Sequence, residues 1–124
     1  MPLHSVYFTA LPCYTQKKSK WGETMNNNVH SEAADRLFDA ILTLKHREEC
    51  YRFFEDICTV NELLSFTQRY EVALMLRRGL TYLEIAELTG ASTATISRVN
   101  RAINTGNGSY DMSFRRLGLL AGEE

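Results

Sequence analysis

The fold is decided by residues 81–103, which have the sequence TYLEIAELTGASTATISRVNRAI. Thr81 and Glu84 have the three-residue spacing of a capping box, which predicts the start of a helix. Gly90 is expected to end this helix, because glycine adopts the left-handed backbone of a tight turn without strain. A second helix is expected to start at about Thr93. The stretch therefore predicts two short helices joined by a tight turn.

The side chains of this stretch divide into an inward and an outward set. The apolar residues expected to point inward are Ile85, Ala86, Leu88, Ile96, Val99 and Ile103. Ala86 is small enough to let two crossing helices approach closely. The outward residues are mostly polar types that contact base edges and phosphates. This pattern indicates a DNA-binding helix-turn-helix, and the residues expected at the DNA are Thr81, Tyr82, Ser92, Thr93, Ala94, Thr95, Ser97, Arg98 and Arg101.

The rest of the chain predicts an all-α fold of about six helices. Apolar residues at helical spacing predict the other helices at about 31–44, 47–57, 59–78 and 110–120. Ser31 and the capping box of Thr59 and Glu62 indicate where the first and third of these begin. The helix at 59–78 is apolar on nearly all sides and must be covered nearly all round. A partner subunit is the expected cover, and complete burial by the same chain is the alternative.

Residues 1–29 are expected to form an N-terminal tail outside a domain at 30–124. The tail carries both prolines, and no helical periodicity appears before Met25. The codons of Trp21 and Gly22 must be rich in G, which resembles a bacterial ribosome-binding site shortly before Met25. Two interpretations stay open, a natural start at Met25 and an ordinary disordered tail.

Composition and charge exclude several classes of function. The net charge of −1 argues mildly against a nucleic-acid binder, but residues 91–117 hold four arginines against the single acid Asp111. No apolar run approaches the roughly 20 residues of a membrane span. Three cysteines without metal spacing favour a reduced, cytoplasmic protein with no metal site. No nucleophile motif or glycine-rich phosphate loop appears, so an enzyme is not expected.

Residues 30–120 resemble the tryptophan repressor family, and within it the YerC/YecD type of bacterial Trp-repressor-like proteins. The resemblance rests on residues 59–62, 67–69 and 76–79, and above all on GASTATISR at 90–98. It implies an intertwined all-α homodimer whose recognition helices enter the major groove of double-stranded DNA. The expected function is a sequence-specific DNA-binding transcriptional regulator, in the first place a repressor. The alternatives are a sigma-factor-like or transposase-like use of the motif, and a helical protein-interaction adaptor without DNA binding.

The resemblance also implies a ligand pocket between two arginines, which match Arg69 and Arg98, with the matching threonine at Thr59. The repressor has glycine directly after the second arginine, whereas this chain has Val99. The branched side chain fills the space that an indole ring would need. We therefore expect no tryptophan and no other cofactor, although another small ligand stays open. The alternative roles are a salt bridge for Arg69 and a phosphate contact for Arg98.

Overall fold

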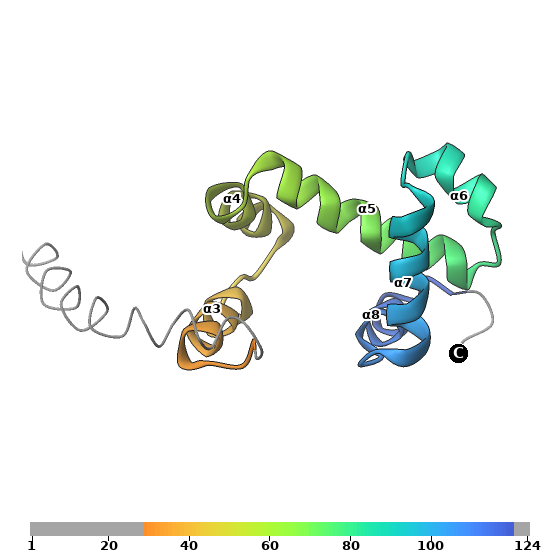
Figure 1. The fold of residues 1–124 in the computed structure, drawn as a ribbon. Helices are drawn as coiled ribbons and strands as arrows, with labels where there is room; N and C mark the ends of the chain where they lie inside the picture. The colour runs from red at the N-terminus through yellow and green to blue at the C-terminus, as the bar shows by residue number, and fades with distance from the viewer. Residues whose placement is uncertain (1–28, 121–124) are drawn as a thin grey trace, which may run out of the picture. The chain divides into compact units, whose positions relative to one another are not determined.

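A computed structural model of the chain describes residues 29–120 (Figure 1). This part of the chain holds six helices and no strand: α3 (Glu32–Leu42), α4 (Arg47–Ile57), α5 (Val60–Arg77), α6 (Tyr82–Thr89), α7 (Thr93–Thr105) and α8 (Ser109–Leu117). The predicted all-α fold of about six helices is confirmed. The predicted tail lies outside the described residues apart from Val29, and its boundary at residue 30 stays a prediction.

Side-chain caps fix the starts of α3 and α5 where the sequence predicted them. Ser31 Oγ accepts a hydrogen bond from the backbone N–H of Ala34 at 3.1 Å. Thr59 Oγ1 accepts from the N–H of Glu62 at 3.1 Å, and Glu62 Oε1 accepts from the N–H of Thr59 at 2.8 Å. A cap of this kind stabilises a helix start by about 1 kcal/mol, because it pairs N–H groups that have no partner within the helix.

The chain divides into two compact units, residues 1–50 and 51–124, with the boundary inside α4. The described part of the first unit is α3 and the first turn of α4. Although α3 has apolar residues at helical spacing, none of its residues is buried in the single chain. Leu37, Phe38 and Leu42 are exposed. The buried face that the sequence predicted for this helix therefore has no cover within its own unit.

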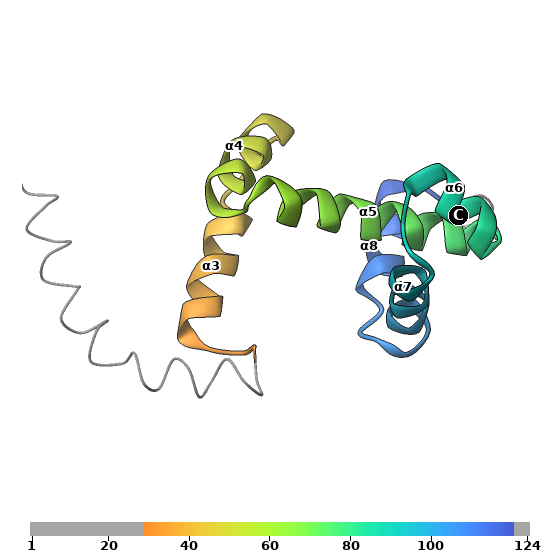
Figure 2. The ribbon, with the colours of Figure 1, turned by 45° about the horizontal axis from the view of Figure 1, so that its top comes forward.

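The core of the second unit lies between the C-terminal half of α5 and the three helices that follow. Helix α5 contacts α6, α7 and α8, and α7 also contacts α6 and α8. Figures 1 and 2 show these three helices gathered at the C-terminal end of α5. The buried side chains are Val72, Ala73, Leu74, Ile85, Ala91, Ile96, Val99, Ile103 and Phe114. The predicted inward positions of Ile85, Ile96, Val99 and Ile103 agree with this core.

Leu88 does not join the core, contrary to the expectation from its spacing. Its exposed fraction is 66%, whereas Ile85 is fully buried and Ala86 is half-buried. Helix α6 has only eight residues, and Leu88 lies in its last turn, at the rim of a hollow that Met75 also lines. The prediction from the helical period, that Leu88 is buried in the core, is therefore wrong.

Three aromatic rings attach α8 to α5. The ring of Phe114 lies edge-on to Tyr70, with centroids 5.1 Å apart, and Tyr110 lies 6.1 Å from Tyr70. Tyr70 Oη and Ser113 Oγ are 2.7 Å apart and share a hydrogen bond. Edge-to-face pairs of this kind contribute about 1 kcal/mol beyond the area they bury, so α8 is held by both apolar and polar contacts.

Among residues 29–120, no helix is both long enough and apolar enough to cross a membrane.

Candidate nucleic-acid interface

The connection between α6 and α7 has the local structure that the sequence predicted. Thr81 Oγ1 accepts from the N–H of Glu84 at 3.2 Å, and Glu84 Oε2 accepts from the N–H of Thr81 at 2.8 Å. Gly90 ends α6 with a φ of 72°, in the left-handed region that favours glycine. Ser92 Oγ then accepts from the N–H of Thr95 at 3.1 Å and starts α7. The hydrogen bonds of these caps join residues three positions apart, so the starts of both helices follow from the local sequence.

Helix α7 has a buried face and an exposed face. Ile96 and Val99 anchor it in the core with exposed fractions of 0% and 2%. Of the residues predicted to contact DNA, Ser92, Thr93, Ala94, Arg98 and Arg101 are exposed, while Thr95 and Ser97 are half-buried. The predicted base- and phosphate-contacting residues therefore lie outside the core and mostly open to solvent.

Three of the predicted DNA contacts already have structural tasks. Tyr82 is half-buried and packs against the core. The hydroxyl of Thr81 caps α6, and the hydroxyl of Ser92 caps α7 and hydrogen-bonds Thr95 Oγ1 at 3.1 Å. Their contact with DNA stays a prediction, and these hydroxyls would have to serve the cap and a phosphate together.

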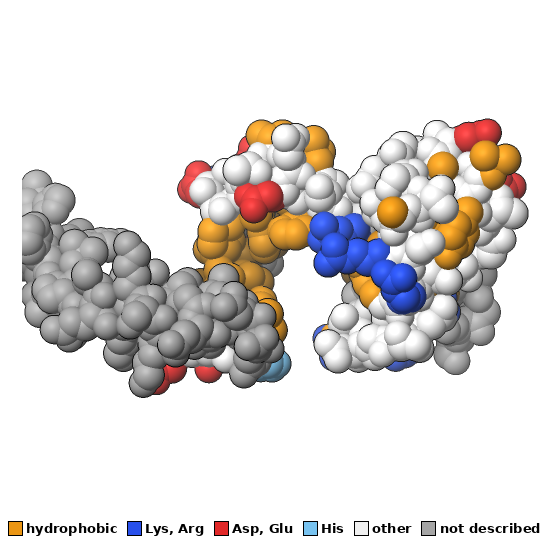
Figure 3. Space-filling model, viewed as in Figure 1, with side chains coloured by type: hydrophobic (Ala, Val, Ile, Leu, Met, Phe, Trp, Pro, Cys, Tyr) orange, Lys and Arg blue, Asp and Glu red, His pale blue; other side chains and the backbone are white. Residues whose placement is uncertain are grey.

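Figure 3 shows basic side chains gathered on one face, over α5 and α7, and since neither helix contains lysine these are arginines. The arginines of these two helices are Arg69, Arg77, Arg98 and Arg101. A protein with a net charge of −1 thus still presents a locally basic surface. Positive charge concentrated in one place attracts an anionic polymer such as DNA over several ångströms, even where the whole molecule is close to neutral.

The residues predicted for a ligand pocket have different surroundings. Val99 belongs to the core, so its side chain fills space on the buried face of α7. The guanidinium carbon of Arg69 lies 5.9 Å from the centroid of the Phe66 ring, a cation–π distance. Within the described residues the ion pairs do not include Arg69. Its contact is therefore with a ring, and the structure gives no support to the salt-bridge alternative.

Thr59 lies apart from Arg69 in the single chain. It precedes α5, whereas Arg69 lies ten residues further along the chain, which corresponds to about 15 Å of helix. The hydroxyl of Thr59 is also engaged in capping α5. One chain by itself does not bring Thr59 and Arg69 into one cluster, and their sharing of a ligand stays a prediction.

A shallow hollow of about 200 Å³ lies between α5 and α6. It is lined by Thr67, Gln68, Glu71, Met75, Leu88 and Thr89. Gln68 Nε2 donates to the backbone carbonyl of Thr89 at 3.1 Å across the helix pair. None of the residues predicted for the ligand pocket lines this hollow.

A polar cluster that was not predicted from the sequence lies at the C-terminal end of α7. Arg77, in the last turn of α5, donates to both carboxylate oxygens of Asp111 at 2.8 Å, and to the carbonyl of Ile103 at 2.9 Å. The hydrogen bonds from Arg77 hold the pKa of Asp111 below its ordinary value of 3.8. A signal was present in the sequence, because Asp111 is the lone acid in the basic segment 91–117.

The described residues contain no group of three or more metal-ligating side chains. Besides Asp111, the pKa of Glu62 is lowered, first by the hydrogen bond from the backbone of Thr59 and then by the bond with its side chain. Both lowered pKa values have a structural cause, a cap or an ion pair.

Comparison with known proteins identifies relatives over most of the chain. The family model of the Trp repressor protein matches residues 32–118. The uncharacterized protein YerC of Bacillus subtilis (strain 168) is 55% identical over 91 residues, which cover 73% of this chain and 88% of YerC. A TrpR-like protein from Eubacterium eligens, whose crystal structure is known, is 62% identical in sequence to this chain. The two structures match with a TM-score of 0.74, over 77% of this chain and 98% of that one.

A further relative of known structure comes from Staphylococcus aureus. It is 53% identical, has a TM-score of 0.72, and the match covers 74% of this chain and 92% of that one. These matches support a DNA-binding regulator of transcription at the level of the family, which is regulatory and not enzymatic. The resemblance found in the sequence is confirmed, and this chain belongs to the Trp repressor family.

Proposed function

We propose that this chain is a homodimeric, sequence-specific DNA-binding regulator that represses transcription, with α6 and α7 as its helix-turn-helix. The observation that carries the proposal is that one face of α7 is buried and the opposite face is exposed and polar. Ile96, Val99 and Ile103 fix it to the core, while the opposite side presents exposed hydroxyl and guanidinium groups. A helix that packs on the core with one face and presents polar groups on the other is suited to the major groove, which admits one α-helix.

The residues of α7 divide further into base and phosphate contacts. Thr93, Ala94 and Ser97 lie in its first turns, the part that meets base edges in this motif. Arg101 lies about one turn beyond Ser97 and is exposed, which suits a phosphate contact. Arg98 is also exposed, and a phosphate contact is its simplest role.

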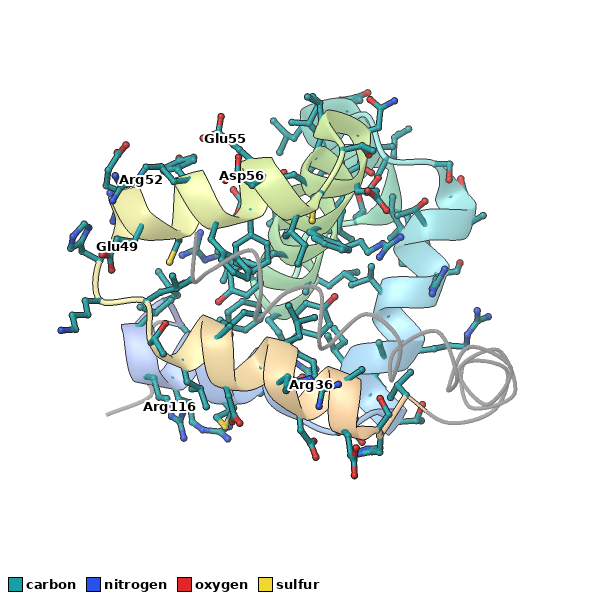
Figure 4. The ribbon with its side chains drawn as sticks, turned by 90° about the vertical axis from the view of Figure 1, so that its left-hand side faces the viewer. Arg36, Glu49, Arg52, Glu55, Asp56 and Arg116 are labelled. Carbon is teal, nitrogen blue, oxygen red and sulfur yellow. The ribbon has the colours of Figure 1, made fainter. Side chains whose placement is uncertain are left out.

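The proposed dimer rests on apolar side chains that the single chain leaves exposed. In the second unit, Val60, Leu64 and Phe66 on α5 have exposed fractions of 75%, 59% and 48%. The neighbouring part of α4 is amphipathic, because Arg52, Glu55 and Asp56 lie along one side of it (Figure 4). Its other side carries Phe53, Phe54 and Ile57. Large apolar patches of this kind mark interaction sites, and a second copy offers the same surface in return.

A second copy is also what the predicted ligand pocket needs. Thr59 and Arg69 of one chain are separated by almost three turns of helix, so a shared ligand would require Thr59 from the other subunit. Because Val99 is part of the core, an indole ring beside it would overpack the site, at a cost of about 1–3 kcal/mol. We therefore propose DNA binding without tryptophan, with a smaller or anionic ligand at Arg69 as the remaining option.

Fluorescence anisotropy with labelled duplex DNA tests the proposal. The chain should bind random duplex DNA at low salt and lose affinity steeply as salt rises, because phosphate contacts release counterions. Arg101→Ala should lower the slope of log affinity against log salt by about one on every sequence. Ser97→Ala should instead change which sequence is preferred, at a cost of about 1–3 kcal/mol at one base pair.

The control is Glu71→Gln, which removes an exposed charge from the hollow between α5 and α6 and should leave the sequence preference unchanged. A protein-interaction adaptor would show no salt-sensitive DNA binding at all, and that result would overturn the proposal. Calorimetric titration with millimolar tryptophan, with and without DNA, tests the ligand. Saturable heat together with tighter DNA binding would contradict the expectation from Val99.

A further inference from the structure

Arg77 connects the end of α7 to two other helices. It lies in the last turn of α5, and its Nε and Nη2 atoms donate to Oδ1 and Oδ2 of Asp111, each at 2.8 Å. Nη2 also donates to the carbonyl of Ile103 at 2.9 Å, and Nη1 reaches Oδ1 of Asn104 at 3.4 Å. One guanidinium group thus joins α5, the last turn of α7 and the first turn of α8.

The charges of this pair match the helix ends beside them. Helix α7 has no basic residue in its own last turn, and the carbonyl ends of helices carry partial negative charge. Arg77 supplies the missing cation from α5 and pairs the carbonyl of Ile103. Asp111 lies in the first turn of α8, whose N-cap Gly108 provides no side-chain hydrogen bond. The pair therefore stabilises the end of α7 and the start of α8 together.

The rest of α7 lacks a second polar attachment of this kind among the described residues. Ile96 and Val99 hold its first half by apolar packing, which is not directional. A bidentate arginine–carboxylate pair fixes both distance and angle, and the side chains of Arg77 and Asp111 are 30% and 24% exposed, so water screens the pair only in part. Apolar contacts therefore hold the first half of α7 in place, and the arginine pair is a directional contact at its C-terminal end.

We propose that Arg77 and Asp111 form a clamp that sets the angle of α7 against α5 and so raises DNA affinity without contacting DNA. The proposal rests on the proposed function of α7 as recognition helix. In the proposed dimer the uncovered N-terminal half of each α5 contacts the second copy, and its C-terminal end carries Arg77. A clamp that fixes α7 to α5 then fixes the geometry with which both helices meet the two half-sites. Arg77 and Asp111 are positioning residues in this scheme.

Asp111→Asn distinguishes a clamp from a plain charge effect, because the two predict opposite signs. Removing a negative charge next to a DNA-binding helix should strengthen binding to the polyanion if only charge matters. If the clamp matters, Asp111→Asn should weaken binding by about three- to tenfold and leave the salt slope unchanged. The probe is the duplex selected from genomic fragments by the wild-type protein.

Three more variants complete the experiment. Arg77→Lys keeps the charge but loses the two-pronged contact, so it should behave like Asp111→Asn, and the double variant should lose little more than either single one. Arg78→Gln removes a positive charge from the same end of α5. Arg78 donates to the carbonyl of Leu119 at 2.9 Å and not to α7. Arg78→Gln should therefore change affinity less than twofold.

Hydrogen exchange of the free protein provides a measurement that does not depend on DNA. Asp111→Asn should raise exchange in the last turn of α7, residues 102–105, and at its C-cap Gly106, while the amides of Val72 and Ala73 stay protected. If the wild-type protein binds no DNA, the proposed function fails and the exchange result still reports on the clamp. If Asp111→Asn binds DNA as tightly as the wild type or more tightly, with unchanged exchange, the clamp is refuted.

Discussion

The two halves of α5 both carry apolar side chains, but those of one half are buried and those of the other half are exposed. In the C-terminal half, Val72, Ala73 and Leu74 are buried by α6, α7 and α8. In the N-terminal half, Val60 and Leu64 are more than half exposed. Since both halves belong to one continuous helix of 18 residues, helix propensity does not explain the difference. Apolar periodicity indicates that a face will be covered, and it does not indicate which molecule supplies the cover.

The largest effect is expected from a charge in the uncovered half. Leu64→Glu should destabilise the protein by about 4 kcal/mol if a second copy buries this position, because an unpaired carboxylate would be desolvated there. Leu88→Glu is the matched control, because Leu88 is similarly exposed on α6, and its change should stay within about 0.5 kcal/mol. Thermal unfolding at several protein concentrations, with light scattering, measures both. If both variants behave like the wild type and scatter as monomers, the N-terminal half has no partner.

A smaller and different effect is expected in the covered half. Val72→Ala should cost about 2 kcal/mol, because it opens a cavity in a core that α6, α7 and α8 already fill. Urea unfolding measures the free energy. The dimer should persist in this variant, whereas it should dissociate in Leu64→Glu. A Val72→Ala protein that becomes monomeric would show that the two halves are not independent.

Lowering the pH should weaken the stabilising contacts at both ends of α5. The pKa of Asp111 is lowered by Arg77, the last residue of α5, and the pKa of Glu62 is lowered by Thr59 at the N-terminal end. A lowered pKa means that the folded chain binds fewer protons than the unfolded chain. The stabilisation is therefore complete above the ordinary pKa and is lost as pH falls through the folded value.

Asp111→Asn should consequently cost about 1 kcal/mol at pH 7, and its difference from the wild type should shrink as the pH falls below 3.8. Glu62→Gln should show the same trend, starting below the ordinary glutamate value of 4.5. Urea unfolding between pH 2 and pH 7 measures both. A difference that grows toward low pH would reverse the sign and contradict the assignment.

The smallest effect is expected from removing residues 1–24. If a second copy covers the N-terminal half of α5, a chain that starts at Met25 should keep its dimer mass and lose less than about 1 kcal/mol. Light scattering and thermal unfolding measure both quantities. A larger loss together with a monomer mass would show that residues 1–24 supply part of the cover.

The sequence predicted the parts of this structure that depend on near neighbours. The caps at Ser31, Thr59 and Thr81 and the stop at Gly90 join residues that are three or four positions apart, so each is visible in a short stretch. The pair of Arg77 and Asp111 spans 34 positions. No spacing rule relates residues that far apart, because only the packing of α5 against α8 brings them together.

The candidate site shows the same division. The outward polar face of α7 followed from its 3.6-residue period, whereas the exposure of Leu88 depends on where the eight-residue α6 ends against α5. The separation of Thr59 from Arg69 could have been predicted from the sequence, because both positions belong to the helix expected at 59–78 and ten helical residues span about 15 Å.

The two-sided construction of α7 also bears on how such a regulator can acquire a new operator. Thr93, Ala94 and Ser97 contribute nothing to the fully buried core, so substitutions there should change the preferred DNA sequence at little expense in folding stability. Under the proposed function, target choice and structural integrity depend on different side chains of the same helix. A family built this way can diversify its targets by single substitutions, and the same three positions are where an engineer would start.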